Sequence, residues 1–278
     1  MVSVIVAAHN EEAVIGACVD ALLGQTPRPE VVVSANGCTD HTAQIAAGRG
    51  VVVVDRSEAG KAGALNAGDA VATSFPRIYL DADIVAPPGA IAALRSAIEA
   101  GALVAVPGRR MATAGRPWPV RAYVAINSRL PAFRNGLFGR GMIAVAEAGR
   151  ARFDAFPTVV ADDLFLDALF GPRERTVVSE VEVVVEAPYT TAELMNRLAR
   201  VRRGNTQLRE AVADDGDLRV RGSDRWAWLR DVVLKKPWLA PAAIPYVVIT
   251  LLAAARARRP DTDWGRDEST RVSRPAPS

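Results

Sequence analysis

The sequence predicts an α/β fold, in which helices flank a mostly parallel β-sheet and an apolar helical segment follows toward the C-terminus. Short apolar runs of strand length alternate with stretches whose apolar residues recur at helical spacing. This alternation is typical of βαβ units and of a parallel sheet. The chain has 278 residues, half of them hydrophobic, which is enough to bury a substantial core.

The first half of the chain contains five predicted strands. Residues 2–8 form the first strand, and Glu11-Glu12 open a helix that Gly24 ends, because acidic side chains favour the first turn of a helix and glycine favours its end. The other predicted strands are residues 31–33, 51–54, 78–85 and 103–106. Helices are predicted from Thr39 or Asp40 to Ala47, over residues 60–72, and from Pro87-Pro88 onward.

The second half is less regular. Residues 137–145 have the pattern of a strand interrupted by Gly139-Arg140-Gly141, and glycines inside a strand often mark a close approach to a ligand. A helix is predicted over residues 161–170, with Asp162 and Asp163 in its first turn. A strand over residues 177–185 and a basic helix over residues 191–212 follow.

Two carboxylates stand at the end of the fourth predicted strand, in the run IYLDADIV. Asp81 and Asp83 are two residues apart, so both side chains point to the same side of a strand. Open α/β sheets bind ligands at the carboxyl ends of their strands. Two carboxylates there suit Mg²⁺ or Mn²⁺, and the cation in turn can hold a diphosphate. The alternative is a pair of solvated aspartates in a turn.

Charge is unevenly distributed along the chain. The net charge is +3, but residues 191–260 contain 14 Lys and Arg against 7 Asp and Glu, so this region carries +7 and the remainder −4. A basic C-terminal third favours phosphate-rich or membrane-surface partners and is too weakly basic to indicate nucleic acid. The cysteines, Cys18 and Cys38, and the two histidines have no zinc or disulfide spacing. The N-terminal residues lack the pattern of a signal peptide, which predicts a cytoplasmic catalytic part.

Residues 238–255 contain no charge and are flanked by Lys235-Lys236 and by Arg256, Arg258 and Arg259. A membrane-spanning helix needs about 20 apolar residues, so this segment is borderline, and Pro241 and Pro245 shorten its regular part. Basic residues on both sides also fit an interfacial segment. We expect contact with a membrane surface; the alternative is a helix buried in the protein's own core.

Several ordered motifs between Val2 and Gly204 resemble those of the family 2 glycosyltransferases, the inverting enzymes of the Rossmann-like GT-A fold. VSVIVAAHNEE resembles the opening strand and its Asn-Glu turn, ANGCTD the second nucleotide loop, and GKAGALNAG the lysine-bearing helix. Asp81-Ala82-Asp83 is similar to the DXD motif, and Ala161-Asp162-Asp163 to the ED motif. Arg197-Leu198-Ala199-Arg200-Val201 stands where processive members carry Gln-x-x-Arg-Trp. Because only the arginine is kept, transfer of a single sugar is expected.

The resemblance implies a role for each matching residue. Asp163 is the expected catalytic base, Asp83 the expected metal ligand, and Mg²⁺ or Mn²⁺ the expected cofactor. The implied donor-binding residues are Ala7, His9, Asn10, Glu11, Asn36, Lys61, Asp81 and Arg200; the implied acceptor-side residues are Gly139, Arg140, Gly141 and Asp162.

The expected activity is inverting, metal-dependent transfer of one sugar from a nucleoside-diphosphate sugar, with a UDP-sugar as the expected donor, to a hydroxyl acceptor. The expected acceptors include lipid-linked and cell-envelope glycans. Residues 1–232 form the expected catalytic domain, with a nucleotide-sugar half (1–106) and an acceptor half (107–232), followed by a membrane-associated segment (233–260) at the cytoplasmic face of the membrane and a polar tail (261–278). A sugar nucleotidyltransferase and a non-catalytic membrane-bound scaffold of the same fold are the alternatives.

Overall fold

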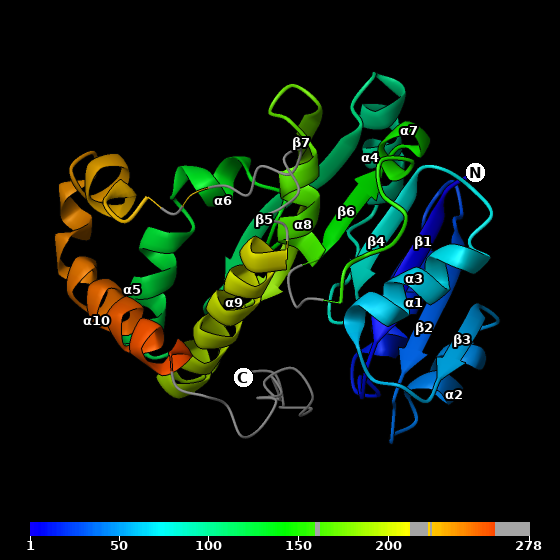
Figure 1. Ribbon diagram of the computed structural model, residues 1–278, viewed down its shortest axis with the longest axis horizontal. Coiled ribbons are helices and arrows are strands. Elements are labelled where there is room, and N and C mark those ends of the chain that lie inside the picture. The colour runs from blue at the N-terminus through cyan, green and yellow to red at the C-terminus, as the bar shows by residue number, and fades with distance from the viewer. Residues whose placement is uncertain (159–161, 212–221, 223, 259–278) are drawn as a thin grey trace.

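Seven strands form one mixed sheet in the order β3-β2-β1-β4-β6-β5-β7 within residues 1–158, 162–211, 222 and 224–258, which the computed structural model describes (Figure 1). β6 runs antiparallel to its neighbours β4 and β5, and the other pairs are parallel. The strands are β1 Ser3–Ala8, β2 Glu30–Asn36, β3 Val52–Arg56, β4 Arg77–Asp81, β5 Val104–Ala112, β6 Met142–Val145 and β7 Arg175–Glu186. The mostly parallel α/β fold expected from the sequence is therefore confirmed.

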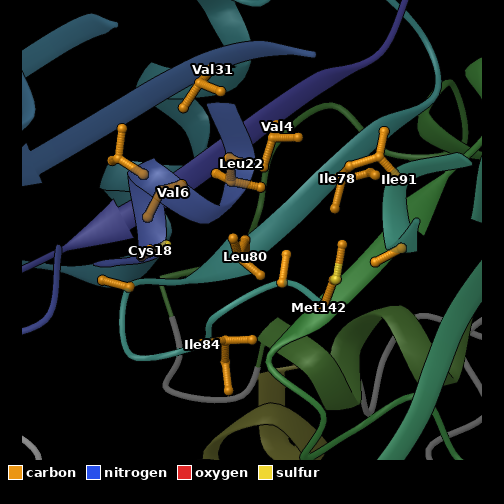
Figure 2. Packing of buried hydrophobic residues seen from close by; sticks show 14 of the residues in the cluster. Val4, Val6, Cys18, Leu22, Val31, Ile78, Leu80, Ile84, Ile91 and Met142 are labelled. Atoms are coloured by element: carbon orange, nitrogen blue, oxygen red, sulfur yellow. The ribbon is translucent and has the colours of Figure 1, made fainter. Parts of the chain in front are cut away.

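Helices cover both faces of the sheet because successive strand residues point to opposite sides. Val4 and Val6 pack with α1 (Ile15–Leu23), α2 (Thr42–Ala47) and α4 (Ala90–Glu99), and Figure 2 shows part of this core. Ile5, between them in sequence, packs on the other face with α3 (Lys61–Val71) and α8 (Asp162–Leu169). Both faces are apolar and buried, which explains why the parallel strands are continuous hydrophobic runs.

Several predicted boundaries differ from the structure for local reasons. The first helix begins at Ile15 rather than at Glu11, because Glu11 O accepts hydrogen bonds from Val14 N (3.0 Å) and Ile15 N (2.9 Å) and forms a turn. The fourth strand ends at Asp81 rather than at residue 85. β6 begins only at Met142, since positive φ angles at two glycines turn residues 137–141 into a loop. Ala161 and Val212, predicted helix ends, lie outside the described residues.

The second half contains more helices than the sequence analysis predicted. α5 (Trp118–Asn127), α6 (Pro131–Asn135) and α7 (Glu147–Arg150) were not expected. α5 packs with α9 (Thr191–Ala211) and α10 (Ala240–Ala257) around a separate apolar cluster that also contains the π-helical turn η1 (Trp228–Val233). Figure 1 shows α5, α9 and α10 side by side at the end of the molecule opposite β3. The short η2 turn (Pro237–Leu239) leads into α10.

The apolar segment of the C-terminal region is largely one helix. Pro237–Ala257 is long and apolar enough to cross a membrane by length and composition, with mean hydropathy 1.9, and 22% of this window is buried in the protein. A helix in the core of a soluble protein passes the same test when it is mostly buried. The predicted polar tail, residues 261–278, lies outside the described residues.

Candidate active site

The carboxyl ends of β1, β2 and β4 meet at one edge of the sheet. Ala7 pairs with Asp81 of β4, and Ala8 pairs with Ala35 of β2, so the loops that follow these strands are neighbours. This is the edge at which parallel α/β sheets place their ligands. The sequence motifs predicted to bind the donor therefore come together in space.

Hydrogen bonds join the loop after β1 to the loop after β2. His9 Nδ1 lies 2.6 Å from Asn36 O, and Thr39 N donates to Asn10 Oδ1 at 2.8 Å. Asn10 has a φ of 54°, a left-handed conformation that asparagine tolerates better than most residues. Glu11 N donates to Thr42 Oγ1 at 2.8 Å. The side chains of His9 and Asn10 thus shape this rim of the site.

Asn36 was expected to contact the donor, but its side chain is bonded to the backbone. It is 3% exposed; Nδ2 donates to Ala8 O at 2.6 Å, and Oδ1 accepts from Gly60 N at 2.8 Å. The amide therefore fixes the end of β1 relative to the residue before α3. This arrangement corrects the expectation of a side chain that reads the base and gives Asn36 a positioning role.

Lys61, the first residue of α3, joins two of the predicted site elements. Its Nζ lies 2.7 Å from Asp81 Oδ1 at the end of β4 and 2.9 Å from Asp162 Oδ2 at the start of α8. Burial lowers the pKa of Lys61, but the carboxylates of Asp162 and Asp81 outweigh it and hold that pKa well above its usual range. The ammonium group is therefore charged, and its side chain is still 41% exposed.

Asp81 and Asp83 have opposite pKa shifts. Burial raises the pKa of Asp81, but the Lys61 charge outweighs it and lowers that pKa below its ordinary value. Desolvation by the surrounding residues and the negative charge of Asp81 raise the pKa of Asp83 to about 6. The positive charge of Arg197 acts in the opposite direction. Asp83 is exposed, whereas Asp81 is half-buried. Because the pKa of Asp83 is raised, an added cation would stabilise its carboxylate.

Asp163, the second residue of α8, lies in the same electrostatic environment. Its Oδ2 accepts a hydrogen bond from Gly139 N at 2.9 Å, and its Oδ1 accepts one from Leu164 N at 2.8 Å. Burial and the adjacent charge of Asp162 raise the pKa of Asp163 to about 6, and the charge of Asp81 acts in the same direction. Asp163 therefore lies close enough to Lys61, Asp81 and Asp162 to feel their charges, as the sequence motifs predicted.

The loop of residues 139–141 closes the site against the end of β4. Gly141 O accepts a hydrogen bond from Asp81 N at 2.8 Å. Gly141 has a φ of 65°, and a Cβ there would lie 2.6 Å from Ile84 Cγ1 and 3.1 Å from Asp81 Oδ2. Gly139 has a φ of 69° and presents its N–H to Asp163. Both glycines are required by their positive φ angles, and Gly141 also by the close approach of Ile84 and Asp81.

Arg140 was expected on the acceptor side, but its guanidinium is directed into the protein. It is 2% exposed and donates hydrogen bonds to the backbone oxygens of Gly136 (3.1 Å), Pro107 (2.7 Å), Phe133 (3.3 Å) and Arg134 (2.9 Å). Burial lowers the pKa of Arg140. Its role is therefore to hold the loop that carries Gly139 and Gly141, which corrects the expectation of direct acceptor contact.

Arginines beyond those expected also face the site. The charges of Arg197 and Arg200 from α9 lower the pKa of Asp81, so Arg197 belongs to the site although only Arg200 was predicted to bind the donor. Arg109 donates to Gly139 O at 2.9 Å, and its charge interacts with that of Asp163. Burial, with Arg140 and Arg197 nearby, lowers the pKa of Arg109 to about 10. In the sequence, the signal for a role of Arg109 is its position in the irregular stretch 109–131, which mixes Arg, Pro and aromatic residues.

A divalent cation fits these residues if it also has ligands from outside the protein. Within the described part of the chain, no group of three or more His, Cys, Asp and Glu side chains is placed to hold a metal ion. Mg²⁺ is commonly bound by one or two carboxylates together with the phosphates of a substrate. The exposed Asp83 carboxylate, repelled by Asp81, supplies that kind of partial site.

The fold and the site define an α/β protein with a cluster of carboxylates and cationic groups at the carboxyl edge of a mostly parallel sheet. The family model described as glycosyl transferase family 2 matches residues 3–151, more than half of the chain. The chain therefore belongs to glycosyltransferase family 2. Among curated proteins, no match was found.

Solved structures of two glycosyltransferases have the same fold. The mannosyltransferase PcManGT from Pyrobaculum calidifontis, in complex with GDP-Man and Mn²⁺, is 21% identical, covers 93% of this chain and 76% of its own, and has a TM-score of 0.59. Glucosyl-3-phosphoglycerate synthase from Mycobacterium tuberculosis, in complex with Mn²⁺, UDP and glucosyl-3-phosphoglycerate, is 20% identical, covers 76% and 79%, and has a TM-score of 0.56. These likenesses establish the GT-A fold.

Proposed function

We propose that this protein is an inverting, metal-dependent hexosyltransferase that moves one sugar from a nucleoside-diphosphate sugar, with a UDP-sugar as the first donor to test, to a hydroxyl acceptor. The observation that carries the proposal is the convergence of Asp81, Asp162 and Asp163 around Lys61 at the carboxyl edge of the sheet. Residues 1–106 would bind the donor, and residues 107–232 the acceptor. The Mn²⁺ complexes of the two structural neighbours, one with GDP-Man and the other with UDP and glucosyl-3-phosphoglycerate, support this assignment.

In this reaction the acceptor oxygen forms a bond to the anomeric carbon while the bond from that carbon to the diphosphate oxygen breaks. The electron pair of the broken bond leaves with the nucleoside diphosphate, and the configuration inverts. Asp163 accepts the proton of the acceptor hydroxyl. Its pKa of about 6 makes it a stronger base than an ordinary aspartate, while it remains ionised at neutral pH.

Cationic groups of the chain would stabilise the departing diphosphate. Lys61 carries a charge at the rim, and Arg197 and Arg200 add positive potential from α9. Fixed positive charge placed where negative charge develops lowers the barrier of such a step. A divalent cation held by Asp83 would neutralise further charge on the diphosphate.

We propose that α10 binds the membrane surface and lies in its plane. Four side chains on its outer face are exposed: Ile244 (71%), Leu251 (63%), Leu252 (52%) and Val248 (49%). The opposite face packs against α5 and α9, and α9 carries several arginines, so these neighbours favour an interfacial position over a spanning one. Lys235-Lys236 and Arg256 flank the apolar face and suit the anionic cytoplasmic leaflet, where we place the protein.

Calorimetric titration of the purified full-length protein tests the main proposal. UDP-glucose and GDP-mannose are titrated with and without Mn²⁺, and release of nucleoside diphosphate is followed with a panel of hydroxyl acceptors. We expect binding of at least one donor to depend on the metal. If neither UDP-glucose nor GDP-mannose binds, with or without Mn²⁺, the protein is better described as a non-catalytic scaffold.

A further inference from the structure

A large cavity lies away from the acidic site, between α5, α9, α10 and the segment that includes η1. Its volume is about 1250 Å³, and its lining contains none of the aspartates at the rim of the sheet. Small-molecule sites usually have volumes of about 300–1,000 Å³. The cavity is therefore larger than the binding of a sugar or a nucleotide requires, and it suits a long ligand.

Apolar and aromatic side chains form much of its wall. Tyr123 of α5 and Tyr246 of α10 stack with their ring centroids 5.1 Å apart, and Trp228 lies 5.9 Å from Tyr246. The helices α9 and α10 contribute aliphatic side chains to the lining, among them Leu198, Val201, Val247, Leu251 and Ala254. Such a wall favours a hydrocarbon chain because burial of the chain removes apolar surface from water.

The polar part of the described lining is strongly cationic. It contains six arginines and two aspartates: Arg202, Arg203, Arg209, Arg225, Arg230, Arg258, Asp224 and Asp231. Both aspartates pair with Arg230, at 2.8 and 2.7 Å. Arg202, Arg225 and Arg258 add positive charge to the described lining, which favours a ligand with a negative group.

The cavity reaches the exposed apolar face of α10. Leu251 lines the cavity and is also 63% exposed, next to Leu252 and one turn from Val248 on the outer face. Leu251 thus belongs both to the cavity lining and to the exposed apolar surface of α10, which makes it the expected entry point for a hydrocarbon chain.

A chain of side-chain and backbone contacts links the cavity wall to Asp163. Phe133 lines the cavity, and the guanidinium of Arg109 lies 5.0 Å from the centroid of its ring. The same guanidinium donates to Gly139 O, and Gly139 N donates to the Asp163 carboxylate. Two residues thus connect the wall of the cavity to the carboxylate proposed as the base.

We infer that this cavity holds the apolar chain of an anionic, hydroxyl-bearing amphiphile that serves as acceptor. The chain enters beside Leu251, the negative group lies against Arg202 of α9, and the hydroxyl is directed toward Asp163. This inference rests on the proposed function for the identity of the ligand as acceptor. The binding of the amphiphile itself follows from the cavity.

Dodecyl phosphate, kept below its micellar concentration, is a suitable probe for calorimetry on the full-length protein. Inorganic phosphate and dodecanol separate the contributions of the head and the chain. Ala254→Phe fills the cavity and Arg202→Gln removes one of its charges, whereas Ala255→Phe on α10 and Arg121→Gln on α5 are matched controls outside the lining. Binding of UDP and Mn²⁺ to each variant, with its thermal unfolding, reports on the donor site and the fold.

We expect dodecyl phosphate to bind at least tenfold more tightly than either partial probe, and both cavity variants to weaken it at least tenfold. The controls should stay within twofold, and UDP binding should not change. The inference would be overturned if both cavity variants bound dodecyl phosphate as tightly as the unmodified protein does. It would also be overturned if the unmodified protein bound inorganic phosphate or dodecanol as tightly as dodecyl phosphate, or did not bind dodecyl phosphate at all. If neither the unmodified protein nor any variant bound UDP in a metal-dependent way, the proposed function would be refuted. Binding of dodecyl phosphate that still depended on the cavity residues would then support the cavity as an amphiphile site.

Discussion

Lys61 and Asp162, which are 101 positions apart in sequence, are joined by an ion pair of 2.9 Å between Nζ and Oδ2. Lys61 begins α3, and Asp162 begins α8, so this pair holds the donor side of the site against the helix that carries Asp163. The same Nζ contacts Asp81 at 2.7 Å. A donor diphosphate that recruits this ammonium group must therefore compete with two carboxylates of the protein.

Lys61→Met should weaken binding of the donor. A hydrogen bond to a charged group contributes about 1.5–3 kcal/mol, which corresponds to roughly 10- to 150-fold in affinity. Calorimetry with UDP and Mn²⁺ measures the change. Lys236→Met, which removes an exposed charge far along the chain, is the control and should leave the affinity unchanged. Equal affinity of the Lys61 variant would show that the lysine serves the fold alone.

Asp163→Asn should abolish transfer and retain donor binding. General-base catalysis contributes about 10²–10⁴ in rate, so we expect a loss of about 10³-fold in kcat. In the unmodified enzyme, with Mn²⁺ saturating, kcat/KM should fall about tenfold per pH unit below the pKa of Asp163, because protonated Asp163 cannot accept the hydroxyl proton. A bound cation moves that pKa below the value of about 6 that the protein alone gives. Full turnover by the variant would assign the base to another group.

Stability should also depend on the protonation of Asp163. Its folded-state pKa is raised to about 6 from 3.8, so the folded protein binds this proton more tightly than the unfolded chain does. The ionised group therefore destabilises the fold, and this cost appears as the pH rises from about 4 through 6. Asp163→Asn should gain stability over the unmodified protein at pH 8 relative to pH 4, by at most about 3 kcal/mol. Urea unfolding at both pH values measures the difference, and a gain independent of pH would contradict the assigned pKa.

Arg140→Gln should destabilise the protein by about 2–4 kcal/mol, because it leaves several buried backbone oxygens without donors. The urea midpoint measures this loss. Arg134→Gln, which changes an exposed side chain in the same region, should have little effect. A normal midpoint together with a raised KM for the acceptor would restore the original expectation that Arg140 binds the acceptor.

The sequence predicted the part of the site that depends on strand ends. Asp81 follows a buried apolar run, and parallel pairing brings Ala7, Asn36 and Asp81 to one edge whatever the details of packing. Local pattern also identified α3 and α8, which begin at charged residues.

The direction of a side chain depends on partners distant in sequence, and no local pattern contains it. Asn36 is turned inward by Ala8 and Gly60, and Arg140 by backbone oxygens of β5 and of the stretch that contains α6. Arg197 was overlooked for the same reason: its role depends on how α9 crosses the carboxyl edge. The helices α5 and α6 are short and mix Arg, Pro and aromatic residues, so their helical period was obscured.

The outer face of α10 provides the last prediction. Ile244→Ser, Val248→Ser and Leu252→Ser together remove exposed apolar surface without changing the buried contacts of Tyr246 and Ile249. If this face binds a bilayer, the triple variant should lose most of its co-sedimentation with vesicles of phosphatidylcholine and phosphatidylglycerol, since each large apolar side chain contributes about 1.5–3 kcal/mol on burial.

A second set of measurements separates membrane binding from stability. The triple variant should unfold at the same urea concentration as the unmodified protein, because these side chains are exposed in the fold. High salt should weaken vesicle binding of the unmodified protein only in part: it screens Lys235-Lys236 and Arg256 but leaves apolar burial intact. A triple variant that still sediments with vesicles, or an unmodified protein that remains in solution beside them, would assign the apolar face of α10 to a protein partner instead.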